Sequence, residues 1–363
     1  MSMRSGRYPR DPQHEVHCRA ETLRPMLAQM LKRSSLFPYD VAVVVDRILE
    51  TELYGIPSHG LVRFCRLLEA IDLGDVDPRG QVLTLTQGDA FAVLDGSRAI
   101  GHVAATKGAE LASSKAKTTG VAAVAIGNSQ TLGAAEVYVR LMAQAGVIGI
   151  CTTNTGRASV AAPNSTAGAV GNCAFAYAVP VDGHSPLVFD TACGAESWGK
   201  LELLQRYGIP LPGSLAFTAD GGAAFSLADA MSLLPAGGAM GFGLSILCSV
   251  LAGLLAGGRM PIHKTRRTSA DDSEHFFLAI DPMKFCDPQN FQQELRTTLD
   301  EIRDLPRTDP DNPVRIPGDR GALSFEKYSQ EGIPVHRSIV EELRMKAEQM
   351  KLAHPFESPS NQD

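Results

Sequence analysis

The middle of the chain alternates between short apolar runs and alanine-rich segments, and this alternation is the feature that most restricts its fold. Each apolar run has the length of one buried strand, and the segments between the runs have the length of helices. We expect strands at residues 121–126, 147–151 and 186–190, with helices at residues 133–144 and 195–207. Strands and helices that alternate in this way predict a layered α/β architecture.

Both ends of the chain show helical periodicity instead. Apolar residues recur every three or four positions within residues 23–31, 38–53 and 59–71, which is typical of helices with one buried face. A last helix is expected at residues 338–352. The polar ends, residues 1–20 and 353–363, are expected to be disordered or extended tails. The N-terminal segment has no apolar core that could serve as a signal peptide.

Residues 230–258 carry no charge and could be mistaken for a membrane span. Pro235 and a cluster of glycines interrupt the first half, and the continuous apolar part, residues 244–256, is shorter than the ~20 residues that a span needs. We therefore expect a buried core helix and no membrane partner. The glycines at residues 237–243 either turn backbone N–H groups toward an anion or allow close helix packing.

The charge balance and the cysteines exclude several classes of protein. The chain has 34 Lys+Arg against 40 Asp+Glu, so it lacks the basic excess of a dedicated nucleic-acid binder. Its seven cysteines form no CxxC pair, which argues against a disulfide framework and against a zinc site. These features fit a cytoplasmic protein without a bound metal.

The common cofactor and catalytic motifs are missing. No GxGxxG follows an expected strand, so an ordinary Rossmann dinucleotide fold lacks its fingerprint. The sequence also lacks GxxxxGK[ST], GxSxG and HExxH. Candidate functional residues must therefore be found from local chemistry.

The segment around Ser58, His59 and Gly60 is the first candidate, with Arg63 four residues after the histidine. A helix that begins here places His59 and Arg63 on one face. The histidine can transfer a proton and the arginine can bind a carboxylate through two hydrogen bonds, which suits reduction of a 2-oxo acid. The alternative is that Ser58 caps a helix and His59 is a surface residue.

Asp190 is the second candidate because it ends an apolar strand and is followed by small residues. Active sites of α/β proteins are usually formed at strand ends. The alternative is that Asp190 is the N-cap of the next helix. Cys193 lies close by, and we interpret it as a buried, inert thiol because nothing near it in the sequence would lower its pKa.

Taken together, these segments resemble the malate/L-lactate dehydrogenase family of the L-sulfolactate dehydrogenase type, over roughly residues 24–351. That family includes ureidoglycolate dehydrogenase, 2,3-diketo-L-gulonate reductase and Δ1-piperideine-2-carboxylate reductase. The matching segments are SHGLVRF (58–64), TNT (153–155), 186–200, LLPAGGAMGFGL (233–244), LAGLLAGG (251–258), FFLAIDP (276–282) and RIPGDR (315–320).

The resemblance implies a non-Rossmann α/β fold with a large mixed sheet, in a homodimer whose active site lies near the subunit interface. It divides the chain into a helical, substrate-binding part (residues 21–115 with 315–352) and a cofactor-binding α/β part (residues 116–314). It also implies NADPH or NADH as cofactor and a small carboxylate as substrate, and it gives site residues three roles. The catalytic residues would be His59, the proton donor, with Ser58 and Asp190. The substrate-binding residues would be Arg63, Asn154 and Thr155. The cofactor-binding residues would be Asn128, Thr131, Asp190, Thr191, Ala192, Cys193, Gly194, Met240, Gly318, Asp319 and Arg320.

The chain departs from the usual family residues at several of these sites. At six positions this chain has a different residue from the one usual in the family, which is given in parentheses: Thr131 (histidine), Cys173 and Ala174 (Asn-Pro), Gly194 (serine), Met240 (lysine) and Ser249 (glutamate). Met240 cannot bind a phosphate or carboxylate by charge as lysine can.

The resemblance and these departures leave two candidate functions. The first is an NAD(P)H-dependent reductase of a 2-oxo acid or a cyclic imino acid, that is, an imine reductase in the second case. The alternative is a repurposed relative with a non-redox role, such as a lyase, an isomerase or a binding subunit.

Overall fold

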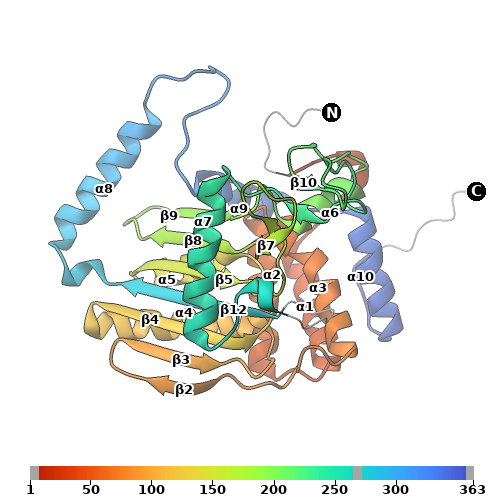
Figure 1. Ribbon diagram of the computed structural model, residues 1–363, viewed down its shortest axis with the longest axis horizontal. Coiled ribbons are helices and arrows are strands. Elements are labelled where there is room, and N and C mark those ends of the chain that lie inside the picture. Colours follow the sequence, from red (N-terminus) through yellow and green to blue (C-terminus); the bar gives the residue numbers. More distant parts are fainter. Residues whose placement is uncertain (1–7, 265–271, 357–363) are drawn as a thin grey trace, which may run out of the picture.

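The computed structural model describes residues 8–264 and 272–356 of the chain. A seven-stranded mixed sheet lies between helices on both of its faces (Figure 1). Its strands, in spatial order, are β2 (Leu83–Gln87), β3 (Phe91–Asp95), β4 (Val121–Ser129), β12 (Ser273–Ile280), β5 (Ile148–Asn154), β8 (Ala174–Val179) and β9 (Leu187–Ala192). The predicted strands at residues 121–126, 147–151 and 186–190 are confirmed as β4, β5 and β9, although β5 and β9 each begin one residue later than predicted and all three strands end later.

Only β3 and β4 run parallel in this sheet, and every other neighbouring pair is antiparallel. A Rossmann sheet is built from parallel strands with crossover helices. The antiparallel pairing therefore explains why the glycine-rich fingerprint is missing, and it confirms the predicted non-Rossmann α/β fold with a large mixed sheet.

Helices α4 (Gly101–Thr119) and α5 (Ala135–Gln144) cover one face of the sheet. Their contact side is built from small residues, so that the helix axes approach the strands closely. At Gly108 a Cβ would lie 2.5 Å from Ile126 Cδ1 and 2.9 Å from Phe277 Cδ2. Alanine and glycine in this helix are therefore required by packing density rather than by helix propensity.

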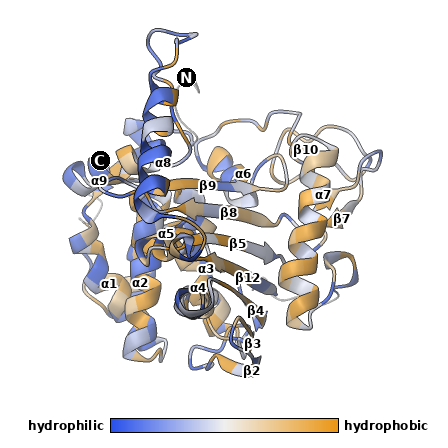
Figure 2. Ribbon diagram, turned by 90° about the vertical axis from the view of Figure 1, so that its left-hand side faces the viewer, coloured by the Kyte–Doolittle hydropathy of each residue, from blue (hydrophilic) through white to orange (hydrophobic). Residues whose placement is uncertain are grey.

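The opposite face of the sheet is covered by α7 (Ala239–Cys248), which continues through a π-helical turn (Ser249–Gly253) and a 3-10 turn (Leu254–Ala256). Ala252 and Ala256 pack against Ala125 and Phe276 of the sheet. The outer side of the helix is apolar and exposed (Figure 2); the exposed residues are Met240, Ile246, Leu247, Val250, Leu254 and Leu255.

The prediction of a fully buried core helix is therefore wrong. Residues Ala239–Ala256 have a mean hydropathy of 2.1, and only 33% of them are buried. Among the described residues this is the one helix long and apolar enough to cross a membrane, and a single such helix is weak evidence for a membrane protein. One side of the helix contacts the sheet and the other side is exposed. The sequence could not show this, because an uncharged segment does not reveal which of its faces will be covered.

The helical layer consists of α1 (Ala20–Arg33), α2 (Pro38–Leu53), α3 (Leu61–Asp72) and α10 (Arg337–Gln349), which share one apolar core. Strand β1 (Glu15–Cys18) pairs antiparallel with β13 (Ile333–His336) beside this core. Both ends of the chain are thereby held together. The expected N-terminal tail is wrong for residues 8–20, which are part of the fold, while residues 1–7 lie outside the described residues.

The expected C-terminal tail, residues 353–363, is also wrong in part. Phe356 packs against the helical core, and residues 357–363 lie outside the described residues. The expected division of the chain also needs correction. Its boundary between residues 115 and 116 falls inside α4, and β2 and β3 belong to the same sheet as β4. Residues 83–119 therefore go with the α/β part.

The remaining elements complete the edge of the molecule. A small sheet of four short strands lies beside α6 (Trp198–Arg206); its strands are β10 (Ala216–Phe217), β11 (Ser232–Leu233), β6 (Val160–Ala161) and β7 (Gly168–Val170). Helix α8 (Pro288–Arg303) projects at one side of the molecule (Figure 1), and α9 (Asp319–Glu331) lies beside α2.

Candidate active site

Two adjoining cavities, of about 520 Å³ and about 610 Å³, form one continuous cleft. They share five lining residues: Tyr8, Ile56, Phe189, Asp190 and Arg320. The shared residues come from the N-terminal segment, the chain before α3, strand β9 and helix α9. The cleft therefore lies where the helical layer meets the edge of the large sheet.

His59 lines this cleft from a 3-10 turn (Pro57–His59) that leads into α3. Glu52 of α2 stabilises the end of this turn, because its Oε1 accepts a hydrogen bond of 2.6 Å from the backbone N–H of Leu61. Gly60 is required because a Cβ there would collide with the Glu52 carboxyl group. Burial raises the pKa of Glu52 to about 7.

Ser58 connects the histidine to the N-terminal segment. Its side chain is fully buried, and its Oγ lies 2.8 Å from His59 Nδ1 and 2.8 Å from Tyr8 Oη. The N-cap residue of α3 is Gly60, which has no side chain that could accept a hydrogen bond. Glu52 accepts the hydrogen bond of the first helical N–H instead. The alternative in which Ser58 only caps a helix is therefore wrong.

Arg63 lines the same cleft from the first turn of α3. Its Nε donates to the backbone oxygen of Ser58 at 3.3 Å, which holds the guanidinium close to the turn. Helix α6 packs tightly here, because a Cβ at Gly199 would collide with the Ser58 oxygen and lie 3.2 Å from Arg63 Nη2. The structure thus brings His59 and Arg63 to one cleft, but not on one helix face as their spacing predicts, because α3 begins only at Leu61 and His59 lies in the turn before it.

Asp190 lines both cavities from β9. Its Oδ2 accepts a hydrogen bond of 3.1 Å from the backbone N–H of Glu136, at the start of α5. A carboxylate at a helix N-terminus is favoured by the helix dipole. Helix α6 is capped by Ser197, whose Oγ accepts from the N–H of Lys200. The alternative in which Asp190 caps the following helix is therefore wrong.

The residues after Asp190 are divided between the cleft and the core. Thr191, Ala192 and Gly194 line the cleft, whereas Cys193 is buried against two other cysteines, Cys173 and Cys248. A hydrogen bond with Cys248 and burial both raise the pKa of the Cys193 thiol, which makes it inert. The expectation that its side chain contacts a cofactor in the cleft is thereby corrected.

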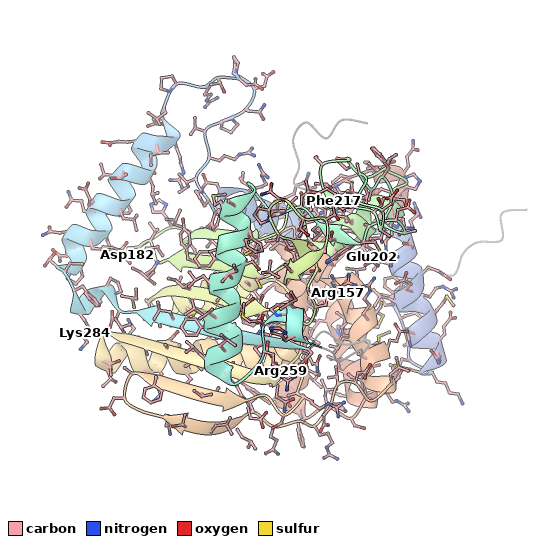
Figure 3. The ribbon with its side chains drawn as sticks, in the orientation of Figure 1. Arg157, Asp182, Glu202, Phe217, Arg259 and Lys284 are labelled. Atoms are coloured by element: carbon pink, nitrogen blue, oxygen red, sulfur yellow. The ribbon has the colours of Figure 1, made fainter. Side chains whose placement is uncertain are left out.

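Two buried polar groups of the cleft have no hydrogen-bond partner among the described residues: Thr155 Oγ1 and Trp198 Nε1. Arg157 comes from the loop after β5 (labelled in Figure 3), and its guanidinium lies over the Trp198 ring at 4.8 Å from the centroid. Unpaired buried donors and acceptors are costly, so these groups are available to a polar ligand.

Asn154, predicted beside Thr155 as substrate-binding, does not line the cleft. Its Nδ2 donates to the backbone oxygen of Arg259 at 2.8 Å and to Glu274 Oε2 at 2.7 Å. Lys264 Nζ lies 2.6 Å from the same carboxylate, and both side chains of this ion pair are almost fully buried. Asn154 therefore belongs to a buried polar network behind β5.

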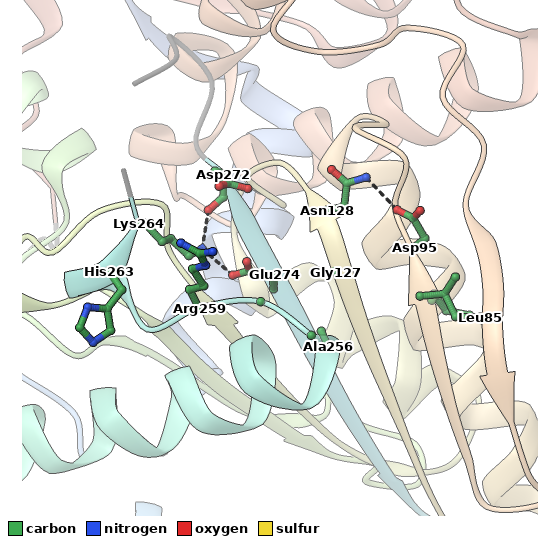
Figure 4. Close-up of a pocket in the computed structure, with 13 residues that line it drawn as sticks. Leu85, Asp95, Gly127, Asn128, Ala256, Arg259, His263, Lys264, Asp272 and Glu274 are labelled. Atoms are coloured by element: carbon green, nitrogen blue, oxygen red, sulfur yellow. Dashed lines mark hydrogen bonds and ion pairs between the residues drawn. The ribbon is translucent and has the colours of Figure 1, made fainter. Parts of the chain in front are cut away.

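Three predicted cofactor residues also lie outside the cleft. Asn128 faces a separate cavity of about 490 Å³ (Figure 4), where its Nδ2 donates to Asp95 Oδ1 at 2.9 Å. Met240 is 72% exposed on the outer side of α7. Asp319 pairs with Arg303 at 2.8 Å and accepts from the N–H of Ile316. The separate cavity shares no lining residue with the cleft.

Of the other predicted cofactor residues, Thr131 and Arg320 line the cleft, and Gly318 lines its second cavity. That cavity is rich in cations: Arg10, Arg315, Arg320 and Lys327 all line it. Sequence reasoning missed Arg10, Arg157, Arg315 and Lys327 as site residues. For Lys327 a signal existed, because Arg320 and Lys327 are seven residues apart and lie on one face of a helix.

The glycine cluster before α7 serves close packing. A Cβ at Gly241 would collide with the backbone oxygens of Ala236 and Cys193. Of the two alternatives for residues 237–243, the structure thus supports close helix packing at Gly241. Because Gly241 has no side chain, α7 can lie in direct contact with the segment that contains Cys193.

Comparison with known proteins gives a consistent result. The family model described as malate/L-lactate dehydrogenase matches residues 18–344. A malate dehydrogenase of Pyrococcus abyssi is 32% identical over 84% of this chain and 86% of its own length. Ureidoglycolate dehydrogenase (NAD(+)) of Escherichia coli K12 is 28% identical, over 89% of this chain and 93% of its own. The solved structure of malate dehydrogenase from Pyrococcus horikoshii is 26% identical and has a TM-score of 0.86, covering 95% of this chain and 99% of that one. The chain therefore belongs to the malate/L-lactate dehydrogenase family of enzymes.

Proposed function

We propose that the protein is an NAD(P)H-dependent oxidoreductase that reduces a 2-oxo acid to the 2-hydroxy acid, or a cyclic imino acid to the corresponding amino acid. The observation that carries the proposal is that His59, Arg63 and Asp190 line one cleft. The names of the relatives, which are dehydrogenases of hydroxy acids, support the same class of reaction.

The substrate class follows from the groups that line the first cavity. Arg63 offers a planar pair of N–H donors, which matches a carboxylate. Thr155 Oγ1 and Trp198 Nε1 are unpaired polar groups on the same cavity and are available to the rest of a small polar molecule. A small acid with a carbonyl or imine next to its carboxylate fits these groups.

The second cavity fits the phosphate-bearing part of a dinucleotide. Arg315, Arg320 and Lys327 line it, and Arg320 also reaches the first cavity. Cationic side chains that line one cavity can bind the pyrophosphate that joins the two halves of NADH or NADPH. When bound, the cofactor supplies the hydride; Asp190 and Thr191 would line its nicotinamide part.

In the proposed mechanism, this chain's residues hold the acid and move one proton. Arg63 anchors the carboxylate, which fixes the neighbouring carbon at the end of the cleft where His59 lies. His59 gives a proton from its Nε2 to the oxygen or nitrogen that gains negative charge. Asp190 lies in the same cleft and stabilises the protonated imidazole.

The departures from the family residues are divided between the cleft and the rest of the molecule. Cys173 Sγ lies 3.6 Å from Ser249 Oγ, so the replacements at these two positions contact each other in the core. Met240 lies outside the cleft, and a serine Cβ at Gly194 would lie 2.8 Å from Asn172 Oδ1. Among the departures, Thr131, Ala174 and Gly194 line the cleft. The cleft nevertheless keeps His59, Arg63 and Asp190, and this supports the redox function over the non-redox alternative.

We also propose that the enzyme is a homodimer that uses the outer side of α7. Leu247 and Leu254 of this surface are 49% and 48% exposed, and large apolar patches are typical of interfaces. Leu247→Lys with Leu254→Lys is expected to give a monomer in analytical ultracentrifugation. Leu323→Lys, at an exposed leucine of α9, is the control and is expected to stay dimeric. A monomeric wild type would refute this part.

A cytoplasmic location is proposed from the thiols. All seven cysteines are free, including Cys173, Cys193 and Cys248, which are buried in one cluster, and this suits a reducing compartment. Fractionation of cells that produce the protein with a small tag tests this, and recovery in a membrane or secreted fraction would contradict it.

The activity is tested by mixing the purified protein with NADH or NADPH and a panel of 2-oxo acids and cyclic imino acids. Loss of NAD(P)H absorbance is expected with at least one compound, and His59→Ala is expected to abolish it. His184→Ala, at an exposed histidine on a turn, is the matched control and is expected to keep wild-type rates. If no compound is turned over faster than by His59→Ala, the redox function is wrong, and titration of cofactor fluorescence then tests for the binding role.

A further inference from the structure

The N-terminal segment places a tyrosine beside the proposed proton donor. Tyr8 is only 9% exposed and lines both cavities of the cleft. Its hydroxyl is 2.8 Å from Ser58 Oγ, and the same Oγ is 2.8 Å from His59 Nδ1. The family match begins at residue 18, so Tyr8 belongs to a segment that precedes it. Two hydrogen bonds thus connect the N-terminal segment to His59.

The chemistry of His59 determines the direction of these hydrogen bonds, and this step rests on the proposed function. Ser58 occupies Nδ1, so the proton exchanged with the substrate must be on Nε2. After His59 has given that proton away, Nε2 carries a lone pair and the remaining proton must be on Nδ1. Ser58 must then accept a hydrogen bond from Nδ1–H.

A serine that accepts from Nδ1–H needs another acceptor for its own single hydroxyl proton. Ser58 is fully buried, so bulk water does not supply that acceptor. The Tyr8 oxygen, 2.8 Å away, is placed to accept the Ser58 proton. Without it, the Ser58 proton would turn toward Nδ1 and favour the tautomer that carries its proton on Nε2.

We propose that Tyr8 is a positioning residue that acts through Ser58 to hold neutral His59 in the tautomer with its proton on Nδ1. Nε2 is then free to accept a proton from a hydroxy acid, and in the reductive direction it must first take up the proton that it gives to the substrate, while Nδ1–H stays bonded to Ser58. The role corresponds to that of a group that fixes the tautomer of a catalytic histidine, here a hydroxyl pair instead of a carboxylate.

The tautomer can be observed without any turnover, by nitrogen NMR of protein labelled at histidine, with His59→Ala to assign the signal. At a pH where His59 is neutral, the wild type is expected to carry its proton on Nδ1. Tyr8→Phe is expected to shift the population toward Nε2. A wild type with its proton on Nε2, or a variant with an unchanged tautomer, would overturn the proposal. Because no substrate is needed, this result is independent of whether the proposed reductase activity is found.

Kinetics with a double-mutant cycle give the second test. Tyr8→Phe keeps the ring that fills the cleft and is expected to lower kcat on the order of tenfold, the worth of one buried hydrogen bond, with KM almost unchanged. Ser58→Ala is expected to cost more, and adding Tyr8→Phe to it should cost nothing further. Additive losses would show that Tyr8 does not act through Ser58, and would overturn the proposal. Tyr39→Phe, at a tyrosine that is 54% exposed, is the matched control and should leave kcat unchanged.

Discussion

Glu52 supports the turn that carries His59, and replacing it by glutamine should change how stability depends on pH. The carboxyl is buried under Gly60 and accepts the first N–H of α3. Burial raises its pKa from 4.5 to about 7. Glutamine has nearly the same shape and still offers an oxygen to the N–H of Leu61, but it carries no charge.

The sign follows from the raised pKa. Between about pH 4.5 and 7 the unfolded chain loses the Glu52 proton while the folded chain keeps it, so stability falls as the pH rises through this window. Above pH 7 the folded state holds a buried carboxylate at its full cost. A shift of this size corresponds to roughly 2 to 3 kcal/mol of stability lost between about pH 5 and pH 8.5. Glu52→Gln removes this loss.

The assay is urea unfolding followed by fluorescence of the single tryptophan, Trp198, at fixed protein concentration. The stability difference between Glu52→Gln and the wild type should become more favourable to the variant by roughly 2 to 3 kcal/mol between about pH 5 and pH 8.5. Glu110→Gln, at an exposed glutamate of α4, should show no such trend. A difference for Glu52→Gln that stays constant with pH would refute the reasoning.

Three further predictions concern the packing and the charges of the site. Gly199→Ala should push α6 away from Ser58, lowering Tm by several degrees and kcat by more than about tenfold in parallel assays, because its Cβ would meet the Ser58 oxygen; an unchanged kcat would show that this contact yields freely. Lys264→Met leaves the buried Glu274 carboxylate without its cation and should cost about 3 kcal/mol in urea unfolding, and a loss below about 1 kcal/mol would mean that water reaches the pair. Arg63→Lys should raise KM for the acid at least about tenfold with a smaller effect on kcat, because lysine lacks the planar pair of donors; an unchanged KM would assign the carboxylate to another cation.

The sequence predicted the central strands because each is a short apolar run whose burial on both faces leaves no other assignment. Helix α7 was placed correctly but its environment was not, since residues 239–256 are uncharged all round and only the sheet decides which side is covered. The same limit applies to Asn154. Its side chain faces the core because Lys264 and Glu274, more than a hundred positions later, meet it there.

The sequence placed together the candidate residues that lie close in the chain, and its candidate site is incomplete where distant segments contribute. His59 and Arg63 are close in sequence, so the short connection from the turn into α3 is enough to place both at the cleft. Tyr8 carries no signal of its own in a polar N-terminal segment, because its position depends on a strand pairing between residues more than 300 positions apart. Long-range pairing of this kind cannot be read from local patterns.

The pairing of β1 with β13 has a consequence for the order of events during synthesis. Glu15 lies opposite His336, so β1 is synthesised long before β13, the strand with which it pairs. Loop closure over such a distance is among the slow steps of folding. The strand pair beside the segment of Tyr8 can therefore form only after residues 333–336 have been made, so we expect the cleft to be completed late in the synthesis of the chain.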